Sequence, residues 1–285
     1  MASVSESRTR VDEVEDGARF EFGENWNRFL NVLDETRIAE AERSLCSMLG
    51  REDLNGLSFL DVGSGSGLFS LAAARLGADR VHSFDFDPSS VRCTEELKRR
   101  FGPSDASWTI ELGSALDCSY LESLGTFDVV YSWGVLHHTG DLWSALDNVT
   151  HAVVPEGQLF ISIYNDQGLR SDIWTKVKQG YNALPARWQR PYVIAVMAPR
   201  EGLSALYHAA QGRPRAYFDS WRNQRARGMS RWHDLIDWVG GYPFEVARPE
   251  QVFSFVRARG FELERLKTCR GGLGCNEFVF VRKPG

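Results

Sequence analysis

Three glycines at alternate positions, Gly63, Gly65 and Gly67, follow a short apolar run and precede an apolar pattern with helical spacing. Glycine has no Cβ atom, so such a loop can turn tightly and a ligand can lie against its backbone N–H groups. An acid, Asp61, stands just before the loop. It would repel a phosphate but could accept a hydrogen bond from the ammonium group of a bound amino acid. The loop is therefore predicted to bind a ligand with an amino-acid part.

Two adjacent histidines, His137 and His138, follow the apolar run at 127–132. An imidazole can take up a proton near neutral pH, so these two residues are the first candidates for a general base. The alternative is that one of them packs inside the protein and bonds to the backbone. The sequence does not choose between the two histidines.

The elements that must position these residues alternate in type along the chain. Strands are expected near 57–62, 80–85, 107–112, 127–132 and 158–164, and helices near 66–76, 88–101 and 140–153, with a short turn around 118–124. Such alternation predicts a parallel, doubly wound sheet. Ligands of these sheets bind outside the carboxyl ends of the strands, where the glycines and histidines fall.

Four features appear in order: Asp61-x-Gly-x-Gly-x-Gly, Asp85 at the end of the second strand, Leu-His-His at 136–138, and Pro-Glu-Gly followed by an apolar strand at 155–161. Together they resemble the class I methyltransferases that depend on S-adenosylmethionine (SAM), over residues 55–165. The similarity is to the broad group that acts on small molecules in quinone and natural-product biosynthesis. It implies an α/β fold with a doubly wound, mostly parallel, seven-stranded Rossmann-like sheet closed by an antiparallel hairpin.

A nicotinamide-binding Rossmann domain is the nearest competing interpretation, because it also places an acid at the end of its second strand. Its glycines are spaced G-x-G-x-x-G, whereas here Leu68 stands three residues after Gly65. SAM carries no phosphate, so it fits an approach lined by Asp61 better than a dinucleotide does.

The resemblance also implies roles for individual residues. Asp85 would bind both ribose hydroxyls, Phe86 would lie against the adenine, and Ser114 with Ala115 would read the adenine edge. Many members of the family have an acid where this chain has Ser114, and Asp117 is an alternative partner there. The full expected cofactor set is Asp61, Gly63, Ser64, Gly65, Gly67, Asp85, Phe86, Ser114, Ala115, Ser132 and Trp133.

The remaining segments are expected to form the substrate side. We predict a loose tail at 1–20, a lid helix at 21–50, a SAM-binding core at 51–164, a helical cap at 165–248 and the completion of the core at 249–285. His233 is a further catalytic candidate, since Asp237 lies one helical turn away. The expected substrate residues are Trp26, Tyr164, Asn165, Arg231, Trp232 and Asp234.

The net charge of −5 does not indicate a nucleic-acid partner for the whole chain. Five scattered cysteines indicate reduced thiols and a cytoplasmic location, with no ligand spacing for a metal site. No apolar run is long enough to span a membrane, so no membrane partner is expected. The expected partner is a small molecule of anionic or aromatic character, and the oligomeric state is left open.

Two other functions stay open. One is methylation of RNA or protein through the arginine-rich segment 213–231, although neither the Asn/Asp-Pro-Pro-aromatic motif nor a Pro-Cys pair follows the fourth strand. The other is SAM binding without turnover.

Overall fold

The computed structural model describes residues 20, 30, 33–222, 231–270, 272 and 274–284. The described chain divides into two compact units. Of these described residues, the sheet unit contains Leu30 and those within 33–171 and 244–284, and the helical unit contains Phe20 and those within 172–243.

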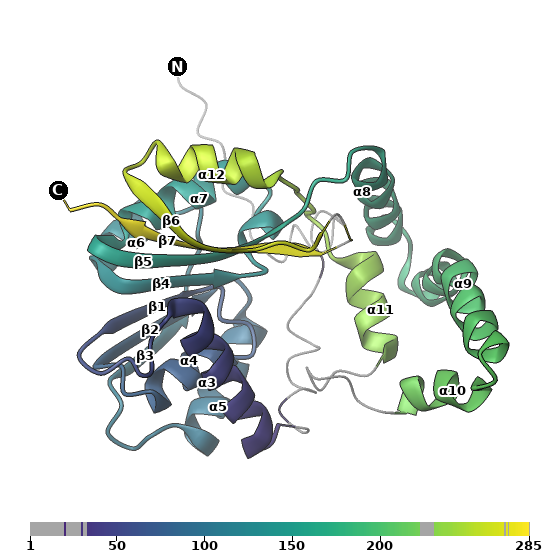
Figure 1. Ribbon diagram of the computed structural model, residues 1–285, viewed down its shortest axis with the longest axis horizontal. Coiled ribbons are helices and arrows are strands. Elements are labelled where there is room, and N and C mark those ends of the chain that lie inside the picture. The colour runs from purple at the N-terminus through teal and green to yellow at the C-terminus, as the bar shows by residue number, and fades with distance from the viewer. Residues whose placement is uncertain are drawn as a thin grey trace. The chain divides into compact units, whose positions relative to one another are not determined.

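The sheet unit is built on one seven-stranded sheet with the order β3-β2-β1-β4-β5-β7-β6 (Figure 1). The first five strands pair in parallel, and β7 pairs antiparallel with β5 and β6. The strands are β1 (Ser58–Val62), β2 (Arg80–Asp85), β3 (Trp108–Leu112), β4 (Phe127–Trp133), β5 (Val153–Tyr164), β6 (Phe261–Lys267) and β7 (Cys275–Arg282).

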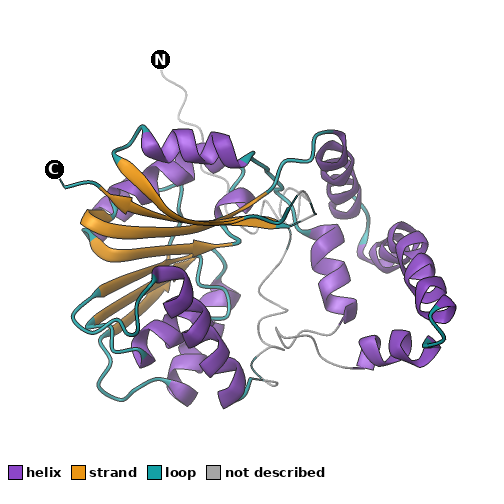
Figure 2. Ribbon diagram, viewed as in Figure 1, coloured by secondary structure: helices purple, strands orange, loops and turns teal. Residues whose placement is uncertain are grey.

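Helices cover both faces of the sheet (Figure 2). One face packs against α3 (Glu35–Leu49), α4 (Leu68–Arg75) and α5 (Pro88–Phe101). The other packs against α6 (Cys118–Leu124), α7 (Leu142–His151) and α12 (Pro249–Arg257). The predicted doubly wound, mostly parallel, seven-stranded fold is confirmed.

Local sequence explains where several helices begin. Asp87 accepts a hydrogen bond from the Ser89 N–H at 2.7 Å and so caps α5, whose first residue is Pro88. Asp141 caps α7 in the same way, through the Ser144 N–H at 3.1 Å. These caps fix the helix starts that follow β2 and β4, at the edge of the sheet where the motifs lie.

Two boundaries differ from the sequence prediction. Strand β5 begins at Val153 rather than near 158, so the predicted Pro-Glu-Gly turn belongs to the strand. Glu156 has a φ of 63° there, and the pairing with β4 changes register between Phe127 and Val129, which allows the strand to continue through an irregularity. The segment expected as a turn around 118–124 is the short helix α6, capped by Asp117.

The helical unit contains most of α8 (Leu169–Asn182), then α9 (Ala186–Ala210), α10 (Pro214–Arg222) and α11 (Arg231–Gly240). Helices were expected at 172–181, 215–227 and 231–239, and α9 was not predicted. The unit has its own small core, made by Tyr181, Val193, Met197, Leu235 and Val239. Residues 223–230 lie outside the described residues.

Within the described residues, no helix combines the length and the apolar character that crossing a membrane requires. Of the lid helix expected at 21–50, the structure describes α3, and Trp26 lies outside the described residues.

Candidate active site

The candidate site lies at the carboxyl edge of the sheet, where the strand order reverses between β1 and β4. The glycine loop follows β1, Asp85 ends β2, and the turn η1 (Leu136–His138) follows β4. Such a switch point is where open α/β sheets bind ligands. The topology therefore brings the three sequence motifs to one place.

The glycine loop depends on its glycines for both conformation and space. Gly63, Gly65 and Gly67 have φ values of 79°, 56° and 78°, a region that residues with a side chain rarely adopt. A Cβ atom on Gly63 would lie 2.3 Å from Val135 Cγ1, and one on Gly67 would lie 2.7 Å from Thr94 Cγ2. The loop is thus held against the segment that follows β4 and against α5.

The end of β2 ties this loop down. Asp85 Oδ2 accepts a hydrogen bond from the Gly65 N–H at 2.9 Å, and Oδ1 accepts one from the Asp87 N–H at 2.8 Å. The Phe84 carbonyl accepts from the Gly63 and Ser64 N–H groups at 2.9 and 3.0 Å. These bonds fix the Asp85 carboxylate beside the glycine loop.

Asp61 lies behind the loop in a buried chain of hydrogen bonds. Ser70 donates to the Asp61 carboxylate, Ser83 donates to Ser70 at 2.7 Å, and Trp108 Nε1 donates to Ser83 at 2.8 Å. Burial raises the pKa of Asp61 to about 7, the Ser70 bond opposes this rise, and the nearby Asp85 charge adds to it. Asp61 can therefore exchange a proton near neutral pH, and a cation beside it would favour its charged form.

Sequence reasoning missed the partners of Asp61. Ser70 is a polar residue with no exposed surface in an otherwise apolar helix, and that break in the pattern was the available signal. Ser83 and Trp108 carried no comparable signal, because Ser83 meets Ser70 only when α4 packs on β2, and Trp108 meets Ser83 only when β2 and β3 pair.

The residues expected at the adenine lie after β2 and β3. Phe86 is half-buried directly after β2, and Ala115 is buried. Ser114 Oγ accepts from the Leu116 N–H at 3.2 Å, and Asp117 accepts from the Tyr120 N–H at 3.0 Å as the cap of α6. Asp117 thus has a structural role that the sequence alone did not suggest.

The end of β4 supplies two more predicted residues. Ser132 is fully buried and donates through Oγ to the Val62 carbonyl at 3.1 Å, which links β4 to the start of the glycine loop. Trp133 is the last residue of β4 and is partly buried against the cluster that contains α4.

The two histidines have different surroundings. His137 has no exposed surface, and its Nδ1 accepts a hydrogen bond from the Tyr164 N–H at 3.4 Å. The ring centroids of His137 and Tyr164 lie 4.1 Å apart. His138 keeps part of its surface exposed, and its ring meets Tyr164 edge-on at 5.5 Å. Phe244 continues the cluster, 5.1 Å from Tyr164. Of the two imidazoles, only that of His138 is accessible to a substrate.

Glu245 fixes the turn that carries these histidines, and sequence reasoning did not find it. Its carboxylate accepts from the N–H groups of Gly140 and Leu142 at 3.1 Å, and its own N–H donates to the His137 carbonyl at 2.9 Å. Burial raises the pKa of Glu245, the two backbone bonds oppose this, and the charge of Asp141 adds to the rise. No sequence motif marks this residue, because its partners are backbone groups about a hundred positions away.

The expected substrate residues fall in both units or outside the described part of the structure. Tyr164 joins the histidine cluster, whereas Asn165 Oδ1 accepts from Asn276 Nδ2 at 3.0 Å and so links the residue after β5 to β7. Trp232 is partly buried against the core of the helical unit. Arg231, His233 and Asp234 lie on α11, but their side chains are outside the described part of the structure, as is Trp26.

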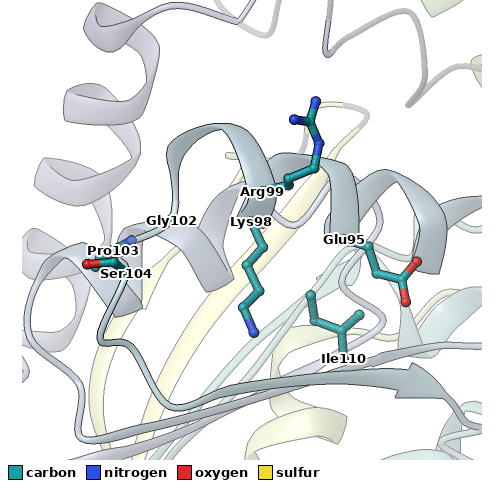
Figure 3. Close-up of a pocket in the computed structure, with 7 residues that line it drawn as sticks. All are labelled: Glu95, Lys98, Arg99, Gly102, Pro103, Ser104 and Ile110. Carbon is teal, nitrogen blue, oxygen red and sulfur yellow. The ribbon is translucent and has the colours of Figure 1, made fainter.

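A surface hollow lies elsewhere on the sheet unit (Figure 3). It is lined by the carboxyl-terminal half of α5, residues 102–104 and Ile110 of β3. Helix α5 runs back from the carboxyl edge of the sheet, so this hollow is separate from the candidate site. Among the described residues, no three His, Cys, Asp or Glu side chains group closely enough to hold a metal ion.

Comparison with known proteins agrees with this geometry. Residues 60–161, from β1 to β5, match a family model described as a methyltransferase domain. A ribosomal protein L11 methyltransferase of Thermotoga maritima is 32% identical over 145 residues, which cover 50% of this chain and 50% of that protein. A ubiquinone biosynthesis O-methyltransferase of Sinorhizobium fredii is 26% identical over 170 residues, which cover 56% of this chain and 66% of that protein. The alignments thus span between half and two thirds of these relatives.

Among solved structures, magnesium protoporphyrin IX methyltransferase from Synechocystis PCC 6803, solved with bound S-adenosylhomocysteine (SAH), superposes with a TM-score of 0.51. The match covers 90% of this chain and 94% of that chain at 13% identity, which shows a shared fold. The predicted resemblance to methyltransferases is confirmed over residues 60–161.

Proposed function

We propose that this chain, whose residues 60–161 match a methyltransferase domain, transfers a methyl group from SAM to an oxygen or nitrogen atom of a small molecule. One observation carries the proposal: the glycine loop, Asp85 and the histidine turn meet at one edge of the sheet, around its switch point. We place the protein in the cytoplasm, because its cysteines are free thiols.

The residues at this edge fit SAM. Residues 63–65 of the loop are only partly buried, so a methionyl group can approach them, and a carboxylate such as that of Asp85 offers two oxygens that suit a pair of ribose hydroxyls. A positively charged ligand would draw the proton from Asp61, whose pKa near 7 makes the charged form accessible. We infer that the site is completed by Ser64, Phe86, Ser114, Ala115, Ser132 and Trp133.

When bound, SAM supplies a methyl group on a positively charged sulfur. The protein's task is to hold the acceptor atom about 3 Å from the methyl carbon, on the axis of the breaking bond. A base is needed only where the acceptor is protonated at the start. We assign this role to His138, because its ring is partly exposed, and we assign to His137 the positioning of Tyr164 and of the turn.

The two histidines make a matched pair for testing that assignment. His138→Ala should lower kcat by about a hundredfold, as is usual for the loss of a general base, and leave SAH affinity unchanged. His137→Ala should instead lower the melting temperature, because it leaves a cavity beside Tyr164. Equal rates for His138→Ala and the parent protein would mean that catalysis is positional.

Asp85→Ala tests the cofactor site. Loss of hydrogen bonds to a charged group should weaken SAH binding by about 1.5–3 kcal/mol. Because Asp85 also holds the Gly65 N–H, Asp85→Asn is the control, since it keeps an acceptor oxygen for the loop. Unchanged SAH affinity in Asp85→Ala would remove the ribose assignment.

A small-molecule acceptor is supported by the ubiquinone O-methyltransferase relatives and by the aromatic residues of the segment 165–248. We infer that this segment forms the substrate side of the protein. A protein acceptor is the second candidate, because ribosomal protein L11 methyltransferases are also among the relatives. We regard SAM binding without turnover as the third.

The first experiment is calorimetry of the purified chain with SAH, with NAD titrated in parallel. Micromolar binding of SAH without NAD binding supports the cofactor assignment, and NAD binding alone would contradict it. An acceptor screen with methyl-labelled SAM then compares phenolic and amine metabolites with ribosomal proteins. Label in the metabolites supports the first candidate, label in protein supports the second, and label in neither supports the third.

A further inference from the structure

Exposed apolar side chains are concentrated in one part of the molecule. Among the described residues, eleven large apolar side chains are exposed, and eight of them fall between residues 169 and 218. These eight are Leu169, Ile173, Trp188, Ile194, Leu203, Leu206, Tyr207 and Phe218. Scattered exposed apolar residues are ordinary, but a concentration of this kind marks an interaction surface.

Helices α9 and α10 show how part of this surface is formed. The Tyr217 hydroxyl of α10 donates to Glu201 of α9 at 3.3 Å, and the Tyr217 ring lies 6.4 Å from His208. The contact between the helices therefore uses the side of α9 that carries Glu201 and His208. Another side carries Leu203, Leu206 and Tyr207, which we call the apolar face of α9.

That face is largely uncovered within the helical unit. Leu203 and Leu206 are each 68% exposed and Tyr207 is 61% exposed, while Phe218 on α10 is 62% exposed. Spacings of three and four residues keep the three α9 side chains on one side of the helix.

Charge identifies the kind of partner. Residues 172–243 contain eleven Arg and Lys and five Asp and Glu, a net charge of +6, whereas the rest of the chain carries −11. Arg200, three residues before Leu203 on α9, is exposed, as are Arg213 and Arg215 after the end of α9. Exposed apolar side chains on a helix within a positively charged segment suit a helix that lies in the interface of an anionic membrane.

We propose that the apolar face of α9, with Phe218 and the flanking arginines, docks the protein on anionic lipid surfaces. Such a helix lies in the plane of the membrane surface and does not span the bilayer. The lack of a spanning segment in the sequence, which led us to expect no membrane partner, therefore does not bear on this proposal. A second copy of this chain is disfavoured as the partner of this face, because two segments with a charge of +6 would repel each other. The proposal does not depend on methyl transfer.

The test uses the full chain and sedimentation with vesicles, either of phosphatidylcholine alone or of phosphatidylcholine with phosphatidylserine. We expect binding to the anionic vesicles only, weakened by salt at 0.5 M because the arginine contribution is screened. No binding to anionic vesicles would overturn the proposal.

Paired substitutions locate the surface. Leu203→Gln with Leu206→Gln should lower vesicle binding about tenfold, because each leucine loses apolar contact with the lipid. Leu112→Gln with Leu266→Gln is the matched control, since these leucines are exposed on the sheet unit and should have no effect. Equal loss in both pairs overturns the proposal. Arg200→Gln with Arg213→Gln should reduce the salt-sensitive part of binding and leaves the apolar face intact.

Three further outcomes would assign the face to another occupant and overturn the proposal. The first is a dimer, detected by sedimentation velocity without lipid, that the Leu203/Leu206 substitutions dissociate. The second is protection of residues 200–210 from hydrogen exchange in the monomer without vesicles, which would mean that the chain itself covers the face. Salt-sensitive binding of a labelled RNA that is unaffected by the leucine pair would point to nucleic acid.

Discussion

The sheet unit and the helical unit bury their helices to very different degrees. Helix α4 of the sheet unit has eight residues, of which five are buried, whereas α9 has 25 residues and buries only Val193 and Met197. A helix packed on a sheet is fixed in position by the many contacts it makes. The sheet unit can therefore position chemical groups closely, while the helical unit still presents apolar surface to something else.

The largest expected effect tests the sheet unit at Gly63. In Gly63→Val, the side chain would meet Val135 and force a branched residue to a φ of 79°. SAH affinity should fall by more than a hundredfold, and the melting temperature should fall as well. Isothermal titration and thermal unfolding measure the two effects.

A double variant separates space from backbone strain at this position. Val135→Ala added to Gly63→Ala removes the two closest contacts but keeps the Cβ of residue 135 at 3.0 Å and the positive φ, so it should recover part of the stability lost in Gly63→Ala alone. Normal SAH affinity in Gly63→Val would mean that the loop is not part of the site.

The next effect concerns the pH dependence of the sheet unit through Asp61. The folded state holds a proton on Asp61 up to a pKa of about 7, whereas the unfolded chain releases it near 3.8. The folded state thus binds more protons between these values, and the contribution of Asp61 to stability is lost as the pH rises through this window. Within this window, the free energy of unfolding falls by at most about 1.4 kcal/mol per pH unit.

Asp61→Asn removes this titration while keeping an acceptor for Ser70. Urea unfolding at pH 5, 6, 7 and 8 should show that the variant gains stability relative to the parent as the pH rises. Its SAH affinity should fall, because a neutral amide cannot pair with a cation. Parallel stability curves for the two proteins would show that Asp61 does not titrate in this range.

A smaller effect should be confined to the helical unit. Lys178 has almost no exposed surface, and its Nζ donates to the Trp238 carbonyl at 2.5 Å, which joins α8 to α11. Lys178→Met leaves that carbonyl without this donor and should cost about 1–3 kcal/mol of stability. SAH affinity should stay at the parent value, with exposed Lys176→Met as the control. Calorimetric unfolding measures the loss of stability, and SAH titration measures the affinity. A loss of SAH affinity in Lys178→Met would show that the two units are energetically coupled.

The contrast between the sheet unit and the helical unit also explains which features could be predicted from the sequence. The five predicted strands were found to within a residue or so, except that β5 begins at Val153 and not near 158, because buried strands form short apolar runs between turn residues. Their order placed the glycine loop, Asp85 and the histidines at one edge. The bonds of Asp61 and Glu245 could not be predicted, since they join positions that only folding brings together.

Helix α9 escaped prediction for two physical reasons. Pro191 and Pro199 lie inside it, and proline normally ends a helical pattern. Its buried residues, Val193 and Met197, are also too few to form the wide buried stripe that marks a helix packed on a core. The apolar residues on its exposed sides obscured the pattern further. The assigned roles of the cofactor, catalytic and substrate residues stay predictions.

The smallest expected effect is at Glu245. We regard it as a positioning residue, and this role depends on the proposed function. Glu245→Gln keeps one acceptor oxygen but turns an amide NH₂ toward the N–H groups of Gly140 and Leu142, which should loosen the turn that carries His138. We expect kcat to fall a few-fold with KM for SAM unchanged, and exposed Glu250→Gln should have no effect.

The pH profile distinguishes this role from general destabilisation. The pKa of Glu245 is raised by burial, with Asp141 adding to the rise and His137 and His138 as the titratable neighbours along the turn. As the pH falls through that pKa, the parent protein also loses its carboxylate, so the rate difference between the parent and Glu245→Gln should narrow in acid. A constant ratio of the two rates at every pH would indicate a structural effect alone. Because hydrogen exchange of Gly140 and Leu142 reports the loosened turn without turnover, a change there with no change in kcat would separate the positioning role from the proposed reaction.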